Sequence, residues 1–400
     1  MSAVEGLRFA KRIGDIMGKS HDLVELMGLS DAPGIISFAG GFPSPETYPI
    51  EDIKETMAEI MREDAAGALS YSSPSGYYEL REQIAARMRK NFGLQSRTEE
   101  ILLVSGSQQG LDLSGLLFID PGDVVIFETP SYLGALSALK TYEARLVAVG
   151  SDEEGMCMDA LERAFETYGD RIKLIYVNPD YQNPTGRSWS ASRRDEFVAF
   201  AERKAVAVIE DAAYAELSYS GEKAKPLISY SKKGFVIYLG TFSKTFCPGL
   251  RTGWICCARE LLERYLALKA NVDLSPATIL HRQLSHYLKT RDLDAHIGRV
   301  GALYKRRRDI MHEAVRNEFP AEATYSLPGG GLFFWVKLPD RIDSRELFAR
   351  SVAENVAFMP GGAFYPNAER NCEMRLNFSN MPEGEIIKGI AVLGRLIKEM

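Results

Sequence analysis

The middle of the chain alternates between short apolar runs and helical patterns. Apolar runs occur at Ile101–Val104, Val124–Phe127, Leu146–Val149, Leu174–Val177, Val206–Ile209 and Phe235–Leu239, and Trp254–Cys257 follows them. Helical patterns such as Ser190–Lys204 lie between most of these runs. Strands that alternate with helices are typical of a parallel or mostly parallel sheet covered by helices. The pattern therefore predicts an α/β fold in which ligands bind beyond the carboxyl ends of the strands.

The two ends of the chain follow a different pattern. A helical pattern runs from Ile13 to Met27, and two further helices are predicted over residues 50–62 and 79–92. After residue 258 helical patterns dominate, and they give way to strands at Leu332–Val336, Val356–Met359 and Met374–Phe378 and a closing helix at Glu383–Glu399. A chain of 400 residues is long for one hydrophobic core. We expect an N-terminal segment (1–45), a large domain (46–290) and a smaller α+β domain (291–400).

The composition narrows the cellular setting. The net charge of −6, with interspersed signs, gives no indication of nucleic acid or an anionic membrane as a partner. No stretch reaches the ~18 consecutive apolar residues of a membrane span, and Met1–Arg12 lacks the apolar core of a signal peptide. The cysteines form no C-x-x-C motif and the histidines no metal-ligand pattern, so we expect no disulfide framework and no metal site. The expected compartment is the reducing cytoplasm.

The stretch Gly240–Trp254, GTFSKTFCPGLRTGW, carries the first candidate chemistry. It places Lys244 just after a buried strand, with Arg251 further along the same loop. Burial disfavours the charged form of a lysine, so its amine becomes a nucleophile near neutral pH. The hydroxyls of Thr241 and Ser243 and the fork of Arg251 suit a phosphate. This is the chemistry of a lysine Schiff base with pyridoxal phosphate (PLP), although an exposed loop lysine and a surface arginine fit the stretch equally well.

Polar residues also follow other predicted strands. Ser107 and Gln108 open a helix, and the free amides of a helix N-terminus favour phosphate, although many such turns look alike. Asn183, which precedes Pro184, belongs either to a plain turn or to a site where its amide meets a ligand oxygen. The loop Ala39–Pro45, which contains paired glycines and two prolines, is either a connector or the lining of a site.

Two charged residues lie at or within apolar runs. Asp211 ends a run of small apolar residues. It either caps a helix or holds a pyridine nitrogen protonated, because a buried acid is costly unless it is paired. Arg375 lies inside Met374–Phe378. A buried arginine usually has a carboxylate partner, which comes either from the protein or from a substrate.

Together these motifs resemble those of the PLP-dependent aminotransferases of fold type I, class I/II, and most of all the 2-aminoadipate, kynurenine and multi-substrate branch. The resemblance extends from about Phe38 to the C-terminus. Its strongest motifs are PDYQNPTG (179–186), EDAAY (210–214), SKTFCPGLRTGW (243–254) and RLNFS (375–379). Supporting motifs are FAGGFPSPETYP (38–49), LSYSSPSGYYELR (69–81), SGSQQGLDL (105–113) and ETPSYLG (128–134). The resemblance implies a large domain with a mostly parallel seven-stranded sheet between helices, plus a smaller α+β domain.

The resemblance also implies the residues that bind and use pyridoxal 5′-phosphate. Lys244 would form the Schiff base and then move the substrate proton, Asp211 would pair with the pyridine nitrogen, and Tyr132 would stack on the ring. The phenolic oxygen of the cofactor would be bound by Asn183 and Tyr214. Its phosphate would be held by Ser107, Gln108, Thr241, Ser243 and Arg251, with Tyr71 reaching the phosphate of the neighbouring subunit in a homodimer.

The substrate would be held by a separate group of residues. The resemblance implies that Arg375 binds the substrate α-carboxylate, with help from Asn183 and from the backbone of Gly40 and Gly41. It also implies that the peptide bonds before Pro130 and Pro184 are cis.

Two departures from the family pattern concern specificity. Members of this branch often carry S-x-I-R-E near the N-terminus, with an arginine that can meet a second substrate carboxylate. Here the region reads Ser20-His-Asp-Leu-Val-Glu25 and lacks that arginine, which favours aromatic or aliphatic donors. The second departure is Ala213, where proline is frequent, and we expect its effect to be minor.

The resemblance predicts an aminotransferase with a ping-pong mechanism. It would move an amino group from an L-amino acid (2-aminoadipate, aromatic or aliphatic) to a 2-oxo acid such as 2-oxoglutarate. The alternatives are a PLP-dependent lyase or decarboxylase, which would need no oxo-acid acceptor, and a PLP-sensing transcription regulator. The regulators carry an N-terminal DNA-binding domain, and no basic recognition helix precedes the aminotransferase-like part in this sequence.

Overall fold

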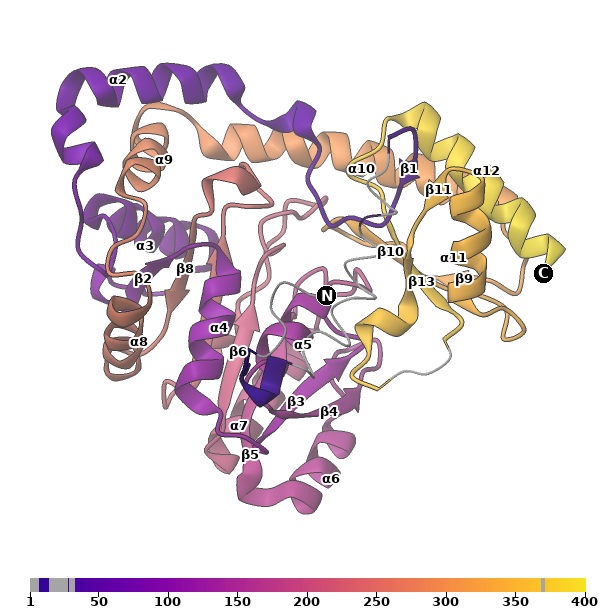
Figure 1. The fold of residues 1–400 in the computed structure, drawn as a ribbon, viewed down its shortest axis with the longest axis horizontal. Helices are drawn as coiled ribbons and strands as arrows, with labels where there is room; N and C mark the ends of the chain where they lie inside the picture. The colour runs from indigo at the N-terminus through magenta and orange to yellow at the C-terminus, as the bar shows by residue number, and fades with distance from the viewer. Residues whose placement is uncertain (1–6, 14–27, 29–32, 368–370) are drawn as a thin grey trace.

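A seven-stranded sheet forms the centre of the computed structural model, which describes residues 7–13, 28, 33–367 and 371–400 (Figure 1). The strand order is β2-β8-β7-β6-β5-β3-β4. The strands are β2 (Ile101–Val104), β3 (Val124–Thr129), β4 (Arg145–Gly150), β5 (Ile172–Val177), β6 (Ala207–Asp211), β7 (Val236–Thr241) and β8 (Gly253–Cys256). Strand β8 is antiparallel to its neighbours, and the other pairs are parallel. The predicted α/β fold with a mostly parallel sheet is confirmed.

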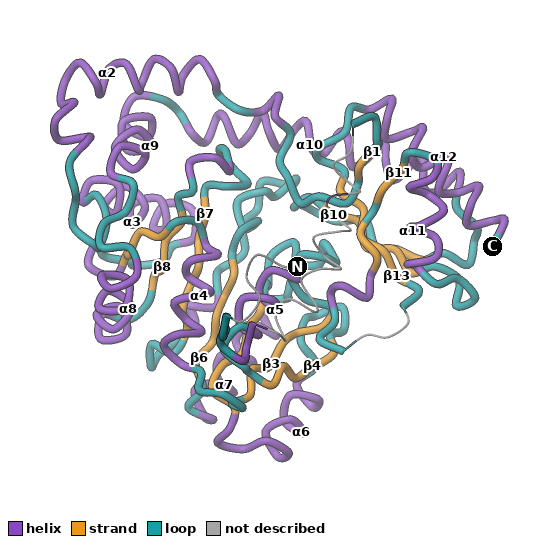
Figure 2. Tube along the Cα trace, in the orientation of Figure 1, coloured by secondary structure: helices purple, strands orange, loops and turns teal. Residues whose placement is uncertain are grey.

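Helices cover both faces of this sheet, because successive side chains of a strand point to opposite faces. Leu102 and Val104 pack on the face covered by α4 (Ser107–Phe118), α5 (Leu133–Lys140) and α8 (Arg259–Val272). Ile101 and Leu103 pack on the other face. That face is covered by α3 (Tyr78–Phe92), α6 (Met158–Tyr168), α7 (Ala191–Lys204) and α9 (Thr278–Thr290). Figure 2 distinguishes the strands from the helices around them.

The C-terminal residues form a second sheet of four strands, in the order β12-β13-β10-β9. Its strands are β9 (Thr324–Tyr325), β10 (Phe333–Lys337), β12 (Met359–Pro360) and β13 (Glu373–Asn377), and all their pairs are antiparallel. The helices α10 (Leu293–Glu318), α11 (Ser344–Ala353) and α12 (Glu383–Glu399) complete this part. One hydrophobic cluster joins them to the sheet. In Figure 1 this part, in orange to yellow, lies beside the large sheet.

Two elements differ from the sequence expectation. The single strand predicted over Val356–Met359 is two strands in different sheets. Strand β11 (Val356–Ala357) is parallel to β1 (Ile36–Ser37), whereas β12 pairs with β13, so the chain changes sheet at Phe358. The helix predicted over residues 50–62 continues as α2 (Ile50–Leu69), with a kink at Asp64 where the backbone leaves helical geometry.

Other expectations stay open. The helical pattern from Ile13 to Met27 lies almost entirely outside the described residues. The domain boundaries at residues 45 and 290 stay a prediction. Within the described ranges, no helix combines the length and the apolar character that crossing a membrane requires.

Candidate active site

The polar residues identified from the sequence gather at one edge of the large sheet. Ser107 follows β2, Asn183 follows β5, Tyr214 follows β6 and Lys244 follows β7. These residues share one edge because the carboxyl ends of parallel strands lie on the same side of a sheet. Strand β8 is antiparallel and therefore begins at this edge, which places Arg251, just before it, beside the others. The topology thus assembles one site from four separate segments of the chain, because Lys244 and Arg251 belong to the same loop between β7 and β8.

Lys244 lies at the centre of this site. Its Nζ donates a hydrogen bond of 2.9 Å to the carbonyl oxygen of Gly41. Burial and the nearby cations Arg375 and Arg251 lower the pKa of Lys244 to about 8, and the carboxylate of Asp211 opposes this shift. Near neutral pH a substantial share of the amine is therefore neutral, which is the form that attacks a carbonyl carbon.

Asp211, at the end of β6, is a buried carboxyl with one unsatisfied oxygen. Its Oδ2 accepts a hydrogen bond of 2.8 Å from the hydroxyl of Tyr176, whereas its Oδ1 is buried and has no partner among the described residues. Burial raises the pKa of Asp211 to about 6, although the Tyr176 hydrogen bond and the charge of Lys244 counteract it. An unpaired buried carboxylate oxygen is costly, so Oδ1 is suited to a protonated ring nitrogen of a bound ligand.

Asn178 fixes the backbone around Asp211 and Asn183. Its Nδ2 donates to the carbonyl oxygen of Asp211 at 2.5 Å, and its Oδ1 accepts a hydrogen bond of 2.8 Å from the backbone N–H of Asn183. The peptide bonds before Pro130 and Pro184 are cis, as predicted. One side chain thus ties the turn after β5 to the end of β6.

Two tyrosines converge on the same space. Tyr214 is buried and interacts with the side chain of Asn183. Tyr132 begins α5, and burial together with the charge of Asp211 raises its pKa to about 12. Burial also raises the pKa of Tyr214 above its ordinary value. Both phenols are therefore protonated at neutral pH and available as hydrogen-bond donors.

A cup of backbone and hydroxyl groups lies beside Lys244. Helix α4 begins at Ser107, and its free N–H groups face the site. The hydroxyl of Thr241 donates to the hydroxyl of Ser243 at 2.9 Å, and both side chains are buried. Arg251 is exposed at the rim and donates through Nη2 to the carbonyl oxygen of Ser105 at 3.2 Å. Gln108 is also exposed, and its side chain donates outward to Gly134 at 3.2 Å.

Two glycines leave no room for side chains at the floor of this cup. Gly106 has a φ of +76°, and an added Cβ would lie 2.5 Å from Nη2 of Arg251. A Cβ on Gly253 would lie 2.7 Å from the backbone nitrogen of Ser107. The backbone amides at the start of α4 can therefore be approached closely, as a phosphate requires.

Arg375 is fully buried but forms no ion pair with any carboxylate of the described residues. Its Nη1 donates to Oδ1 of Asn183 at 2.8 Å, its Nη2 donates to the carbonyl oxygen of Ala39, and its Nε has no partner. The guanidinium lies over the rings of Phe333 and Phe364, at 4.3 and 4.9 Å from their centroids. Burial lowers the pKa of Arg375 to about 10, which still leaves it charged. Its free donor suits an external carboxylate.

The loop of Gly40 and Gly41 lies against the site. Gly41 accepts the hydrogen bond from Lys244, and Gly40 accepts one of 2.5 Å from Nδ2 of Asn377. The structure therefore favours the lining role of this loop over a plain connector.

Tyr71 stays apart from the other predicted site residues. Its side chain is 86% exposed, and no hydrogen bond links it to the site within the described part of this chain. The sequence reasoning missed Tyr176, Asn178 and Asn377. The first two looked like ordinary residues of an apolar strand and its end. Asn377 could have been found, since it lies two residues after Arg375 and therefore on the same face of β13.

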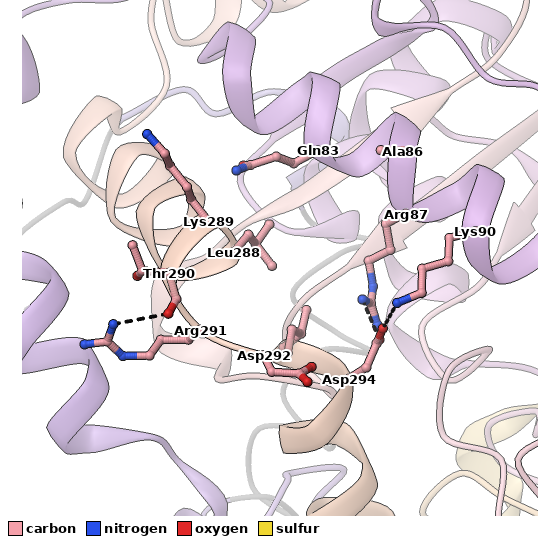
Figure 3. A pocket seen from close by; sticks show the side chains of 11 residues that line it. Gln83, Ala86, Arg87, Lys90, Leu288, Lys289, Thr290, Arg291, Asp292 and Asp294 are labelled. Atoms are coloured by element: carbon pink, nitrogen blue, oxygen red, sulfur yellow. Dashed lines mark hydrogen bonds and ion pairs between the residues drawn. The ribbon is translucent and has the colours of Figure 1, made fainter.

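A cavity away from the sheet edge is lined by charged residues that pair with one another. It measures about 620 Å³ and lies between α3 and the junction of α9 and α10, where Figure 3 shows its lining residues. Arg87 pairs there with Asp294 at 2.7 Å, as does Lys90 at 2.6 Å, and Asp294 is also part of the lining. These charges are already satisfied by one another, and no perturbed nucleophile faces the cavity. No group of three or more metal-ligating residues occurs in the described ranges either.

Pyridoxal 5′-phosphate fits the residues at the edge of the sheet. The unpaired Oδ1 of Asp211 suits its protonated ring nitrogen, and the amine of Lys244 suits its aldehyde. The cup at the start of α4, which would not admit a side chain at Gly106 or Gly253, suits its phosphate.

Comparison with known proteins agrees with this arrangement. The family described as "Aminotransferase class I and II" matches residues 34–393. The chain is 39% identical to aromatic-amino-acid aminotransferase 1 of Thermococcus litoralis over 384 residues, which are 95% of this chain and 92% of the relative. It is 36% identical to 2-aminoadipate transaminase of Thermus thermophilus over 393 residues, which are 98% and 96% of the two chains.

The likeness extends to three dimensions. The crystal structure of Pyrococcus horikoshii kynurenine aminotransferase, in complex with PMP, superposes with a TM-score of 0.90 at 36% identity. The alignment covers 100% of this chain and 96% of that chain. The fold is therefore fold type I, as predicted, and the chain belongs to the class I and II aminotransferases.

Proposed function

We propose that this enzyme is a PLP-dependent aminotransferase that moves the amino group of an aromatic, aliphatic or 2-aminoadipate-type L-amino acid to a 2-oxo acid such as 2-oxoglutarate. The observation that carries the proposal is the convergence of three groups at one edge of the sheet. They are a partly buried amine with a pKa of about 8, a carboxyl with an unpaired buried oxygen and a buried arginine without a carboxylate partner among the described residues. Each lacks the partner that the cofactor or the substrate would provide.

The cofactor, when bound, supplies an electron sink that makes the bonds at the substrate Cα labile. Arg375 binds the α-carboxylate through its guanidinium, and Asn183 holds that guanidinium in place. Asp211 keeps the proton on the ring nitrogen, which favours electron withdrawal. Lys244, once its Nζ is free, would take the proton from the substrate Cα. Tyr214 and Asn183 donate hydrogen bonds toward the phenolic oxygen.

Different residues of the site bind the two ends of the cofactor. The cup formed by Ser107, Thr241, Ser243 and Arg251 takes the phosphate. Its residues border β2, β7 and β8, whereas Asp211 ends β6. Contacts at both ends would hold the cofactor in one orientation beside Lys244. Asp211 is buried and Lys244 is partly buried, which limits the access of water to the proton transfer.

The donor range is proposed from the aromatic surroundings of Arg375. Phe333 and Phe364 flank its guanidinium, and Phe42 in the adjoining loop is 42% exposed. Apolar walls of this kind favour aromatic and aliphatic side chains. The relatives named for aromatic amino acids and 2-aminoadipate support the same range. The segment Ser20–Glu25, on which a preference for acidic side chains depends, lies outside the described residues.

We further propose a homodimer with shared active sites in the cytoplasm. Tyr71 is exposed in this chain together with the large apolar side chains Leu69, Val272 and Leu274. The segments that carry them are joined by a hydrogen bond of 3.0 Å from the backbone of Ser72 to the hydroxyl of Ser275. Such a patch suits burial against a second copy. All five cysteines are free thiols, in accord with a reducing compartment.

An absorbance spectrum of the purified protein with added PLP tests the central proposal. We expect a visible band of the lysine-bound cofactor, which a panel of L-amino acids converts to the spectrum of the amine form, and which 2-oxoglutarate restores. The Lys244→Ala variant is the control and should lack the band. Absence of the band in the wild type would remove Lys244 from its role. Turnover of an amino acid without any oxo acid would point to the lyase alternative.

A further inference from the structure

A chain of hydrogen bonds runs from a buried lysine in α8 to the turn at the start of α4. Lys269 donates through Nζ to Oδ1 of Asp273 at 2.8 Å. The other oxygen of Asp273 accepts a hydrogen bond of 2.9 Å from Nε2 of Gln109. The amide oxygen of Gln109, Oε1, accepts a hydrogen bond of 2.8 Å from the backbone N–H of Ser105. All polar atoms of the Gln109 amide group are thereby engaged, in a defined orientation.

The lysine at the beginning of this chain of contacts is unusual. Its side chain is 0% exposed, whereas that of Asp273 is 21% exposed. Burying an ammonium group is costly, and the cost is offset only if the group is paired and hydrogen-bonded. Burial and the charge of Lys269 lower the pKa of the adjacent His281 to about 4, so this ring is neutral. Lys269 and Asp273 are therefore the charged pair of the cluster, and each fixes the other.

The end of this chain of contacts is the phosphate cup itself. Ser105 is held on both sides of its backbone, by Gln109 at its N–H and by Arg251 at its carbonyl oxygen. The next residue, Gly106, has a φ of +76° and directly precedes the first turn of α4. Small rotations of the Ser105 peptide would therefore redirect the N–H groups of Ser107 and its neighbour. A phosphate depends on the direction of those groups.

We propose that Gln109 and Asp273 are positioning residues for the cofactor phosphate. Asp273, anchored by Lys269, orients the amide of Gln109, and Gln109 sets the backbone of Ser105 and Gly106 so that the start of α4 faces the phosphate. Neither side chain touches the phosphate in this arrangement. This inference rests on the proposed function, since it assumes that PLP binds at Lys244.

The same loop also supports the segment of Tyr71. Ser275, two residues after Asp273, accepts the hydrogen bond from the backbone of Ser72. Asp273 itself accepts at its carbonyl oxygen a hydrogen bond of 2.5 Å from the N–H of Ser275. The loop that orients the cup of its own subunit therefore also fixes the position of the tyrosine that is proposed to reach the other subunit.

The variant Gln109→Met tests the inference, because it keeps the length and helix propensity of the side chain and removes both hydrogen bonds. Apoprotein is titrated with PLP and, separately, with pyridoxal, which has the aldehyde but no phosphate. We expect the Kd for PLP to rise about tenfold and the Kd for pyridoxal to stay within about twofold. Gln83→Met, the same change in α3, where the side chain bonds Ser285 at 3.0 Å, is the matched control and should leave both constants unchanged.

A second variant, Asp273→Asn, tests whether Asp273 acts through Gln109. It removes the charge but leaves an oxygen, and the double variant with Gln109→Met should weaken PLP binding by less than the product of the two single effects. An unchanged Kd for PLP in Gln109→Met would overturn the proposal, and so would equal losses for PLP and pyridoxal. If Asp273→Asn does not fold, the Gln109→Met result alone decides. Failure of the proposed function would look different, because the wild type itself would then bind no PLP.

Discussion

Nη1 of Arg375 donates a 2.8 Å hydrogen bond to Oδ1 of Asn183, and the two residues are 192 positions apart in the chain. Arg375 comes from the C-terminal sheet and Asn183 from the turn after β5 of the large sheet. The contact therefore joins the two parts of the fold at the point where they enclose the site. It also leaves one side of the guanidinium for an incoming carboxylate.

The first prediction concerns Arg375. Arg375→Lys keeps the positive charge but loses the planar fork and its stacking between Phe333 and Phe364. We expect kcat/KM to fall by roughly 10- to 100-fold for every amino donor, mainly through KM, while the spectrum of the bound cofactor is retained. Steady-state kinetics with several donors measure this, with Arg163→Ala on the exposed side of α6 as the control. An unchanged KM would mean that another group binds the carboxylate.

The second prediction concerns Asp211. Asp211→Asn still accepts the hydrogen bond of Tyr176 but cannot keep a ring nitrogen protonated. We expect the rate of the half-reaction with an amino acid to fall at least about 100-fold, as measured in single-turnover experiments by stopped-flow absorbance. Asp211→Glu should retain more activity than Asp211→Asn. Equal rates for the wild type and Asp211→Asn would remove the carboxylate from the mechanism.

The third prediction is that the same variant stabilises the apoprotein. Burial raises the pKa of Asp211 from its ordinary 3.8 to about 6, so the folded state binds this proton more tightly than the unfolded chain. The ionisation of Asp211 therefore lowers the free energy of unfolding progressively as the pH rises from about 4 to 6. Above pH 6 this loss has reached its full size. At pH 7 the free energy of unfolding of Asp211→Asn should exceed that of the wild type by about 1–3 kcal/mol, as measured by denaturant titration. This gain should shrink toward pH 4. Exposed Asp195→Asn should show no such pH-dependent gain.

The fourth prediction concerns the reactivity of Lys244 in the apoprotein. Burial and the cations Arg375 and Arg251 lower its pKa to about 8, so its neutral fraction rises as the pH passes through that value. Labelling with an amine-reactive aldehyde, followed by peptide mass spectrometry, should show a midpoint near pH 8 at Lys244. Exposed Lys289 provides the reference rate in the same sample. A midpoint at the ordinary value of 10.5 would contradict the desolvated environment.

The fifth prediction compares Gly253, the first residue of β8, with Gly249 in the loop before it. A Cβ on Gly253 would lie 2.7 Å from the backbone nitrogen of Ser107 and 2.8 Å from the carbonyl oxygen of Gly240. Since neither backbone can move cheaply, we expect Gly253→Ala to lose about 1–3 kcal/mol of stability and to bind PLP more weakly. Gly249→Ala is the matched control, because no atom lies within 4 Å of its added Cβ. Thermal melts and PLP titrations compare the two variants.

Much of this fold is readable from the sequence because most strands of the large sheet are buried on both faces, with the edge strand β4 as the exception. Runs such as Ile101–Val104 and Phe235–Leu239 are almost wholly apolar and are separated by helical patterns. Arg375 could be singled out for a similar reason, since a charge inside an apolar strand needs a partner. The strand change at Phe358 could not be predicted, because it depends on pairing with β1, more than 300 residues away.

The site was predictable only in part, because local sequence does not show which side chains meet. Tyr176 looks like one more apolar position of β5, and only the structure shows its hydroxyl on Asp211. The anchoring of Gln109 by Asp273 joins residues 164 positions apart, and no local pattern reveals it. For Tyr71 a single chain shows exposure but no partner, so its role stays a prediction.

Three side chains of the site already hold backbone carbonyls of one loop. Arg375 donates to Ala39, Asn377 to Gly40 and Lys244 to Gly41. The loop thus competes with a ligand carboxylate at Nη2 of Arg375 and with a ligand carbonyl at Nζ of Lys244, whereas Nε of Arg375 has no partner to release among the described residues. Amino donor and oxo-acid acceptor meet the same competitor. Substitutions that strengthen or weaken the hydrogen bonds to this loop would therefore change the apparent affinities for the amino donor and the oxo-acid acceptor by a common factor. They would leave the preference for one over the other unchanged.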